Sequence, residues 1–366
     1  MIDLDAIARN YRLLRGRVGD RAIFAVVKAD AYGHGAAAVS RRLAREGADR
    51  FAVANADEGV ALRRAGVGGE ILLLSCAEPG DLPRQLAYGL TPALYDPEQA
   101  EAVLAAADRL SRVVRVHLEV DTGMGRAGIR PEELDRILGL LKGSRRVRLA
   151  GTFANLSAAD DPRSPATERQ VAILRETVAR MRDAGVEPGL VHLANSAGIL
   201  AHPDSWFDGV RPGLALYGIA PSDAIDAEGL EPAMTIETRV IAVRRLPAGI
   251  PLGYGGRFVT ERPSTVAVLP IGYHDGFRRS FSGSVSVLLR GRKAPVVGSV
   301  SMDITLVDAT ATGAERGDLA VCLGRDGDAS VTAWDLARAA GTIPYEILCG
   351  IGPRMARVDR GEGRGA

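Results

Sequence analysis

Short apolar runs alternate with helix-like segments through the first 218 residues of the chain. The helix-like segments repeat their apolar residues with helical spacing and several end at glycine, as in 36–47, 96–110 and 167–185. The eight apolar runs are AIFAVV (22–27), FAVAN (51–55), ILLLS (71–75), TPALY (91–95), VVRVHLEV (113–120), LAGTFANL (149–156), LVHLAN (190–195) and VRPGLALYG (210–218). Eight strands alternating with helices predict an α/β fold, a (β/α)8 TIM barrel. A doubly wound open sheet is the alternative, but the first strand-to-helix junction lacks G-x-G-x-x-G.

The pattern changes after residue 230, where strand-like segments are separated by Gly and Pro. One helical stretch, 332–341, interrupts them. The strand-like segments are 235–246, 264–273, 284–300, 303–309 and 318–324. We therefore expect a barrel domain at 1–229 and a mostly β C-terminal domain at 230–366.

Composition and charge narrow the class of protein. The 366 residues include 46 basic and 45 acidic side chains, a formal net charge of +1, so neither nucleic acid nor an anionic membrane is an expected partner. Cys76, Cys322 and Cys349 are too few and too widely spaced for a disulfide framework or a zinc site, and no metal is expected. No apolar stretch of about 18 residues exists, and the N-terminus lacks the apolar region of a signal peptide. The expected location is the cytoplasm.

Polar residues at the carboxyl ends of the predicted barrel strands are the candidates for chemistry, because TIM-barrel sites lie there. Lys28 directly follows the apolar run 22–27 and should lie at the edge of the barrel interior. Burying an ammonium is costly unless it pairs or loses its charge, and desolvated barrel lysines often form Schiff bases. A surface lysine is the alternative interpretation. The other strand ends carry Arg126, Asn155, Asn195-Ser196 and Arg211-Pro212-Gly213.

Small residues after the seventh and eighth strands suit a phosphate. Barrels frequently bind phosphate there, since backbone N–H groups can approach and a serine hydroxyl adds a donor. Asn195, Ser196 and Gly213 meet this description. A barrel lysine together with a phosphate site indicates an aldolase or a pyridoxal-phosphate enzyme.

Seven motifs, spread over nearly the whole chain, resemble those of the alanine racemases in that family's order. They are AVVKADAYGHG, VDTGMGRAG, HLANSAG, VRPGLALYG, LGYGGRF, PIGYHDGFRR and GSVSMDITLVD. The resemblance implies pyridoxal 5'-phosphate as cofactor, a small amino acid as substrate, and interconversion of L- and D-alanine, with D-alanine supplying peptidoglycan synthesis. It also implies a homodimer with shared active sites.

The same resemblance assigns the cofactor site. Lys28 resembles the lysine that binds the cofactor covalently, and Arg211 the arginine that faces the pyridine nitrogen, with His192 orienting it. The phosphate would contact Tyr32, four residues beyond Lys28 on the first helical turn, together with Asn195, Ser196, Gly213 and Leu214. Arginine cannot accept a proton, so the pyridine nitrogen would stay neutral and transamination would be suppressed.

Racemisation requires a proton-transferring group on each face of the α-carbon. Lys28 would serve one face, and Tyr254, contributed by the partner subunit, the other. Because an ordinary tyrosine has a pKa near 10, nearby cations would have to lower it. The resemblance also implies that the substrate is bound by Arg126, Tyr273, Met302 and Asp303.

Two supporting positions depart from well-known members of the family. Glu119 stands where many carry a carbamylated lysine, and we expect its carboxylate to supply the missing negative charge. Asn155 stands where some carry a histidine near the arginine network, so it would hydrogen-bond without relaying a proton.

Three other functions are compatible with parts of the pattern. A different amino-acid racemase or a decarboxylase on the same scaffold would differ in pocket size, and a decarboxylase would place an acid rather than Arg211 at the pyridine nitrogen. A non-enzymatic pyridoxal-phosphate carrier would lack everything after residue 230. A barrel glycosidase would need two strand-end carboxylates, and only Glu119 is obvious.

Overall fold

The structure, a computed structural model, describes residues 1–76 and 79–361. Its contacts divide the chain into two units. The barrel unit comprises Asp5–Ala31 and Gly35–Glu231. The β unit comprises Met1–Leu4, Tyr32–His34 and Pro232–Ala366, so three residues just after Lys28 belong with the C-terminal part of the chain.

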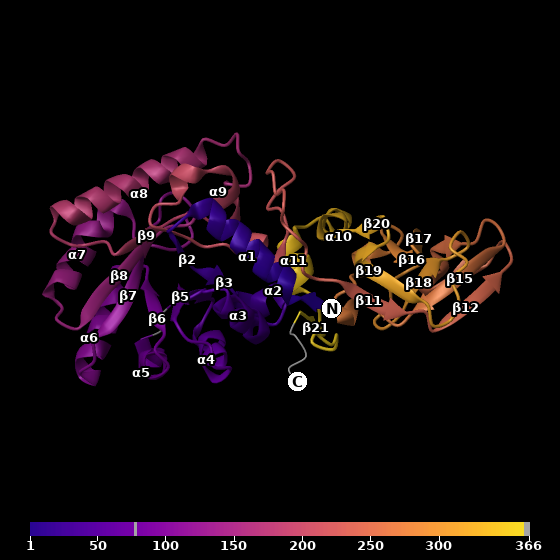
Figure 1. Cartoon of the computed structure of the whole chain (residues 1–366), viewed down its shortest axis with the longest axis horizontal. Coiled ribbons are helices and arrows are strands. Elements are labelled where there is room, and N and C mark those ends of the chain that lie inside the picture. The colour runs from indigo at the N-terminus through magenta and orange to yellow at the C-terminus, as the bar shows by residue number, and fades with distance from the viewer. Residues whose placement is uncertain (77–78, 362–366) are drawn as a thin grey trace. The chain divides into compact units, whose positions relative to one another are not determined.

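Parallel strands form the core of the barrel unit (Figure 1). Their order in the sheet is β2-β10-β9-β8-β7-β6-β5-β4-β3, and every neighbouring pair is parallel. Only Phe24 separates β2 from β3, so the path returns to its starting strand and the predicted (β/α)8 barrel is confirmed. The strands are β2 (Ala22–Ile23), β3 (Ala25–Val26), β4 (Arg50–Val53), β5 (Glu70–Cys76), β6 (Thr91–Leu94), β7 (Val114–Glu119), β8 (Val147–Phe153), β9 (Leu190–His192) and β10 (Gly209–Val210).

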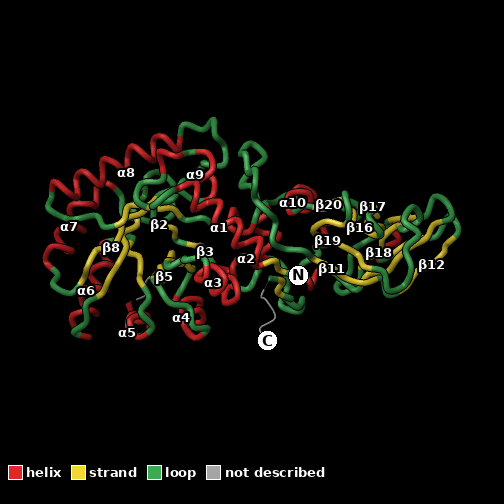
Figure 2. Tube along the Cα trace, in the orientation of Figure 1, coloured by secondary structure: helices red, strands yellow, loops and turns green. Residues whose placement is uncertain are grey.

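Helices lie outside these strands, as Figure 2 shows. Side chains cap some of them: at the start of α6 the side chain of Asp96 accepts a hydrogen bond from Gln99 N–H, and Pro97 occupies the first turn. The helices are α1 (Leu4–Val18), α2 (Lys28–Gly33), α3 (Ala36–Arg45), α4 (Ala56–Arg64), α5 (Leu82–Ala87), α6 (Pro97–Leu110), α7 (Leu134–Gly143), α8 (Ala166–Asp183) and α9 (Ser196–Ala201). No helix in the described part of the chain is long and apolar enough to cross a membrane.

One predicted strand is shorter than expected. The apolar run 210–218 contributes only Val210 to β10, and Leu214–Tyr217 form the 3-10 helix η4. The proline at 212 has no N–H to continue the strand ladder, and Gly213 bends the backbone with φ −118° and ψ −89°.

Antiparallel strands make up most of the β unit, as the change of pattern after residue 230 predicted. Its main sheet runs β11-β19-β16-β17-β18-β15-β12, and β20 pairs with β19. Two small sheets join β1 to β21 and β13 to β14. The strands are β1 (Ile2–Asp3), β11 (Ile236–Arg239), β12 (Ala242–Leu246), β13 (Pro251–Leu252), β14 (Phe258–Val259), β15 (Ser264–Leu269), β16 (Ser286–Leu289), β17 (Arg292–Val297), β18 (Thr305–Asp308), β19 (Leu319–Asp326), β20 (Ala329–Val331) and β21 (Asp359–Arg360).

Two helices complete the β unit. The predicted helix at 332–341 is α10 (Ala333–Ala340), which begins with a capping box between Thr332 and Asp335. A second helix, α11 (Pro344–Cys349), was not expected from the sequence. At six residues it is too short to display a clear helical period, although Pro344 marks its first turn.

Candidate active site

Lys28 lies at the carboxyl end of the first barrel strand, two residues after β3, and it is half-buried. It opens α2, whose four residues Ala29 to Tyr32 all have φ between 52° and 54°. This turn is therefore a left-handed helix, closed by a hydrogen bond from Ala31 N–H to Val27 O of 2.9 Å. L-residues pay about 1–2 kcal/mol each for that conformation, and such strain is typical of functional sites.

Two carboxylates hold the left-handed turn in place within the barrel unit. Ala29 N–H donates to Glu58 Oε1 at 2.8 Å, and Ala54 N–H donates to Glu58 Oε2 at 2.7 Å. Ala36 N–H donates to Asp30 Oδ1 at 2.7 Å. Sequence reasoning missed Glu58, although Asn55-x-x-Glu58 resembles a capping box at the start of α4. Asn55 does cap that helix, whereas the Glu58 side chain joins the end of β4 to the residue after Lys28.

The residues predicted to bind phosphate occupy the turns after β9 and β10 and the turn after Lys28. Ser196 Oγ accepts hydrogen bonds from Gly213 N–H at 2.9 Å and Ala215 N–H at 3.1 Å, with Leu214 between them. Asn195 caps α9, its side chain accepting from Gly198 N–H at 2.9 Å. Ser196, Gly213 and Leu214 thus form one polar cluster of the barrel unit.

Tyr32 belongs to the β unit, where its ring packs 5.6 Å from that of Tyr345. The side chain is buried, and burial, aided by Tyr345 and Cys349, raises the pKa of its phenol. Tyr32 is therefore a neutral phenol that can act as a hydrogen-bond donor.

Arg211 is a buried guanidinium held by protein acceptors on both Nη atoms. Nη1 donates to His192 Nδ1 at 2.7 Å and to His192 O at 2.9 Å. Nη2 donates to Ala154 O at 2.6 Å and to Asn155 Oδ1 at 3.1 Å. Since these bonds use the Nη hydrogens, Nε–H is the donor that Arg211 can offer to a bound molecule. Burial lowers the pKa of Arg211 to about 10, so the side chain is still cationic at neutral pH.

Asn155 connects Arg211 to Glu119. Asn155 Nδ2 donates to Glu119 Oε1 at 2.7 Å while its own Oδ1 accepts from Arg211. Burial raises the pKa of Glu119, and the charges of Arg211 and Arg126 act against that rise. Within the described residues no ion pair joins Glu119 to Arg126, so Glu119 acts on Arg126 through space and on Arg211 through Asn155.

The remaining predicted residues, all in the β unit, are well exposed in the single chain. Tyr254 is 76% exposed, and its backbone oxygen accepts from Ser299 Oγ at 3.2 Å. Tyr273 N–H donates to Ser301 O at 3.0 Å, which places Tyr273 beside the turn that carries Met302 and Asp303.

Arg354 joins the turn that carries Tyr273 to the turn that carries Met302. It bonds to Asp275 through Nε at 2.7 Å and through Nη2 at 3.0 Å, and to Asp303 through Nη1 at 2.8 Å. Asp303, predicted to bind substrate, therefore already has one cationic partner.

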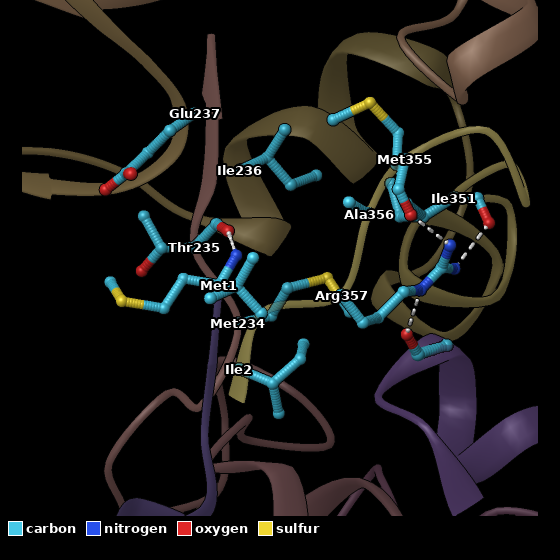
Figure 3. A pocket seen from close by; sticks show the side chains of 12 residues that line it. Met1, Ile2, Met234, Thr235, Ile236, Glu237, Ile351, Met355, Ala356 and Arg357 are labelled. Carbon is cyan, nitrogen blue, oxygen red and sulfur yellow. Dashed lines mark hydrogen bonds between the residues drawn. The ribbon is translucent and has the colours of Figure 1, made fainter. Parts of the chain in front are cut away.

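A hollow of about 370 Å³ in the β unit is lined by none of the predicted residues (Figure 3). Its walls are mainly apolar, including Ile2, Met234 and Met355. The guanidinium of Arg357 donates to the backbone oxygens of Gly33, Ile351, Gly352 and Met355. The cation of Arg357 is satisfied in this way, and the other titratable groups at the hollow, Glu237 and the amino group of Met1, are not among the predicted site residues.

Comparisons with known proteins point to a single family. Family models described as alanine racemase N-terminal domain and C-terminal domain match residues 2–221 and 233–359. The chain is 42% identical over 363 residues to the alanine racemase of Symbiobacterium thermophilum, covering 99% of this chain and 96% of that protein. The crystal structure of alanine racemase from Bacillus anthracis with bound L-Ala-P matches with a TM-score of 0.93 and 33% identity, covering 99% of this chain and 95% of the other. For alanine racemase from Streptomyces lavendulae the TM-score is 0.94 and the identity 36%, with 98% and 96% covered. The resemblance expected from the seven motifs is confirmed, and the chain belongs to the alanine racemase family.

Proposed function

We propose that the chain racemises alanine with pyridoxal 5'-phosphate bound at the carboxyl ends of the barrel strands. The observation that carries this proposal is Arg211, a cation whose Nη donors are all engaged and whose Nε–H remains to face a ligand. A donor-only group suits an unprotonated pyridine nitrogen. Lys28 at the first strand end and the cluster of Ser196, Gly213 and Leu214 fit an aldehyde and a phosphate.

When bound, the cofactor supplies an electron sink for the bond between the α-carbon and its hydrogen. The chain has to bind the amino acid, exclude water and move the proton. The amine of Lys28 would exchange the proton on one face of the α-carbon, and the phenol of Tyr254 would do so on the other. Arg126 would hold the substrate carboxylate, while Tyr273, Met302 and Asp303 would border the pocket mouth.

The exposure of the β-unit residues supports a homodimer with shared sites. Three large side chains are exposed to water in the single chain, with exposed fractions of 76% for Tyr254, 50% for Met302 and 43% for Tyr273. Such residues are typical of surfaces that a partner covers. Each subunit would thus complete the other's site with Tyr254. We expect the enzyme to work in the cytoplasm, where its D-alanine would supply peptidoglycan synthesis.

Racemase activity is tested by incubating the purified chain, loaded with the cofactor, with L-alanine in deuterium oxide. D-alanine that carries deuterium at the α-carbon should accumulate. Lys28→Ala should abolish the reaction, and Tyr254→Phe should slow it by roughly 10²–10⁴-fold, the usual contribution of a general acid or base. Lys142, which is exposed, and Tyr88, which is half-buried, provide matched controls outside the site, because Lys142→Ala and Tyr88→Phe should leave the rate unchanged. Failure of the unchanged chain to form D-alanine would refute the proposal.

A further inference from the structure

A chain of side-chain hydrogen bonds runs through the barrel from Arg211 to Glu70. Arg211 Nη1 lies 2.7 Å from His192 Nδ1, His192 Nε2 lies 2.9 Å from His117 Nδ1, and His117 Nε2 lies 3.2 Å from Glu70 Oε1. Both histidines are fully buried. Glu70 is the first residue of β5, so the chain ends at the amino ends of the strands, away from the ends that carry Lys28 and Arg211.

As long as Arg211 donates to His192, the bonds in this chain can run in one direction only. Because Arg211 donates to His192 Nδ1, that nitrogen carries no hydrogen, and a neutral His192 must carry its hydrogen on Nε2. His192 Nε2–H then donates to His117 Nδ1, which leaves the hydrogen of a neutral His117 on Nε2. His117 Nε2–H in turn donates to the carboxylate of Glu70.

The surroundings keep both rings neutral and fixed. The His192 ring lies between Phe24, stacked at 4.6 Å, and Phe153, stacked at 5.1 Å. Burial lowers the pKa of His192, and the charge of Arg211 lowers it further. Burial also lowers the pKa of His117, although Glu70 opposes the change.

Glu70 is the anionic end of the chain. Burial alone would raise the pKa of Glu70, but the hydrogen bond from His117 and the nearby cationic arginines outweigh burial and lower it. Reversing the chain would place His192 Nδ1–H against the donor of Arg211, and an unprotonated His117 nitrogen against the Glu70 carboxylate. Both ends therefore select one direction.

We propose that Glu70 and His117 are positioning residues that hold His192 in its Nε2–H tautomer, so that Nδ1 of His192 remains the acceptor that orients Arg211. This inference rests on the proposed function only for the identity of the ligand that Arg211 faces. Neither residue contacts that ligand. Both act through His192, and Glu70 polarises the neutral rings so that Nδ1 is a stronger acceptor.

The tautomers can be measured directly by 15N NMR of the full chain, labelled at histidine and prepared without cofactor. The 15N chemical shifts of the ring nitrogens should show that His117 and His192 are both neutral with the hydrogen on Nε2. Single His→Asn variants assign the signals. Glu70→Gln keeps an acceptor and should retain this pattern, whereas Glu70→Met should give mixed tautomers at His117. Arg50 is the matched control because its Nε lies 3.7 Å from Glu70 Oε2 without joining the chain, so Arg50→Met should resemble the unchanged protein.

The loaded enzyme gives a second readout. If Arg211 loses its fixed orientation, more turnovers should end with the amino group left on the cofactor and pyruvate released, so the ratio of pyruvate to D-alanine should rise in Glu70→Met and not in Arg50→Met. A hydrogen on Nδ1 of either ring in the unchanged protein, or the same changes in Arg50→Met, would overturn the proposal. Because the NMR measurement needs no cofactor, a chain that shows these tautomers but does not racemise alanine would overturn the proposed function and leave the positioning of Arg211 intact.

Discussion

The left-handed turn after Lys28 predicts that a glycine there stabilises the fold. Ala29 is exposed and has φ 52°, so Ala29→Gly removes strain without removing a buried methyl group. The strain relieved is about 1–2 kcal/mol, and the extra freedom of glycine in the unfolded chain costs about 0.5–1 kcal/mol. The net expectation is a gain in unfolding free energy of roughly 0.5–1 kcal/mol.

The same substitution in a right-handed helix of the same unit should have the opposite sign. Ala172 is exposed in the interior of α8, where Ala172→Gly should cost about 1 kcal/mol. Urea unfolding followed by circular dichroism, at one protein concentration and without cofactor, measures both variants against the unchanged chain. A midpoint lowered in Ala29→Gly as much as in Ala172→Gly would refute the left-handed turn.

Ala29→Gly should lower the activity of the enzyme although it raises the stability. The strained turn directs the chain beyond Lys28, so the more flexible Ala29→Gly should lower kcat even though it unfolds at higher urea. Such a trade is expected where strain serves the site. A variant that is both more stable and fully active would show that the strain has no role in positioning Lys28.

Three further predictions concern buried polar contacts. A methyl group on Gly151 would lie 2.5 Å from His117 Cε1, so Gly151→Ala should lower the unfolding free energy by about 1–3 kcal/mol in urea titrations. Burial would raise the pKa of Asp275, but the bonds of this carboxylate to Arg354 and to a backbone N–H lower the pKa. The stability that Asp275 contributes is therefore present above about pH 4 and is lost as the pH falls further. The midpoint temperature of thermal unfolding should therefore fall less steeply from neutral to acid pH in Arg354→Met than in the unchanged protein. Glu119→Gln should raise KM for alanine more than it alters kcat or stability, and unchanged kinetics would exclude Glu119 from the substrate network.

Much of the fold could be predicted because its signals are local. Eight apolar runs separated by helical periods specify a barrel, and each run overlaps a strand of that sheet. The run 210–218 predicts a longer strand than β10, because an apolar stretch alone does not distinguish a strand from a short helix. The left-handed turn could not be predicted either, since alanine and tyrosine ordinarily favour right-handed conformations.

The candidate site was predicted less completely, because several of its contacts join distant residues. Lys28 and Arg211 follow from their places at strand ends. Neither Glu70 nor His117 stands at the carboxyl end of a predicted strand, and they lie 47 residues apart. His117 is indistinguishable in the sequence from other strand residues, and only the folded barrel brings it next to His192. Glu58 was hidden for a similar reason, because its acceptors serve a turn 29 residues earlier in the chain.

Mixing of subunits tests whether Lys28 of one subunit and Tyr254 of the other complete one site. Lys28→Ala and Tyr254→Phe are each expected to be nearly inactive alone. After equal amounts are unfolded, mixed and refolded with cofactor, about half of the dimers would be hybrids, each with one intact site and one doubly defective site. About a quarter of the activity of the unchanged enzyme should therefore return. If both groups worked within one chain, no hybrid would contain an intact site, and a mixture no more active than its components would contradict a site shared between subunits.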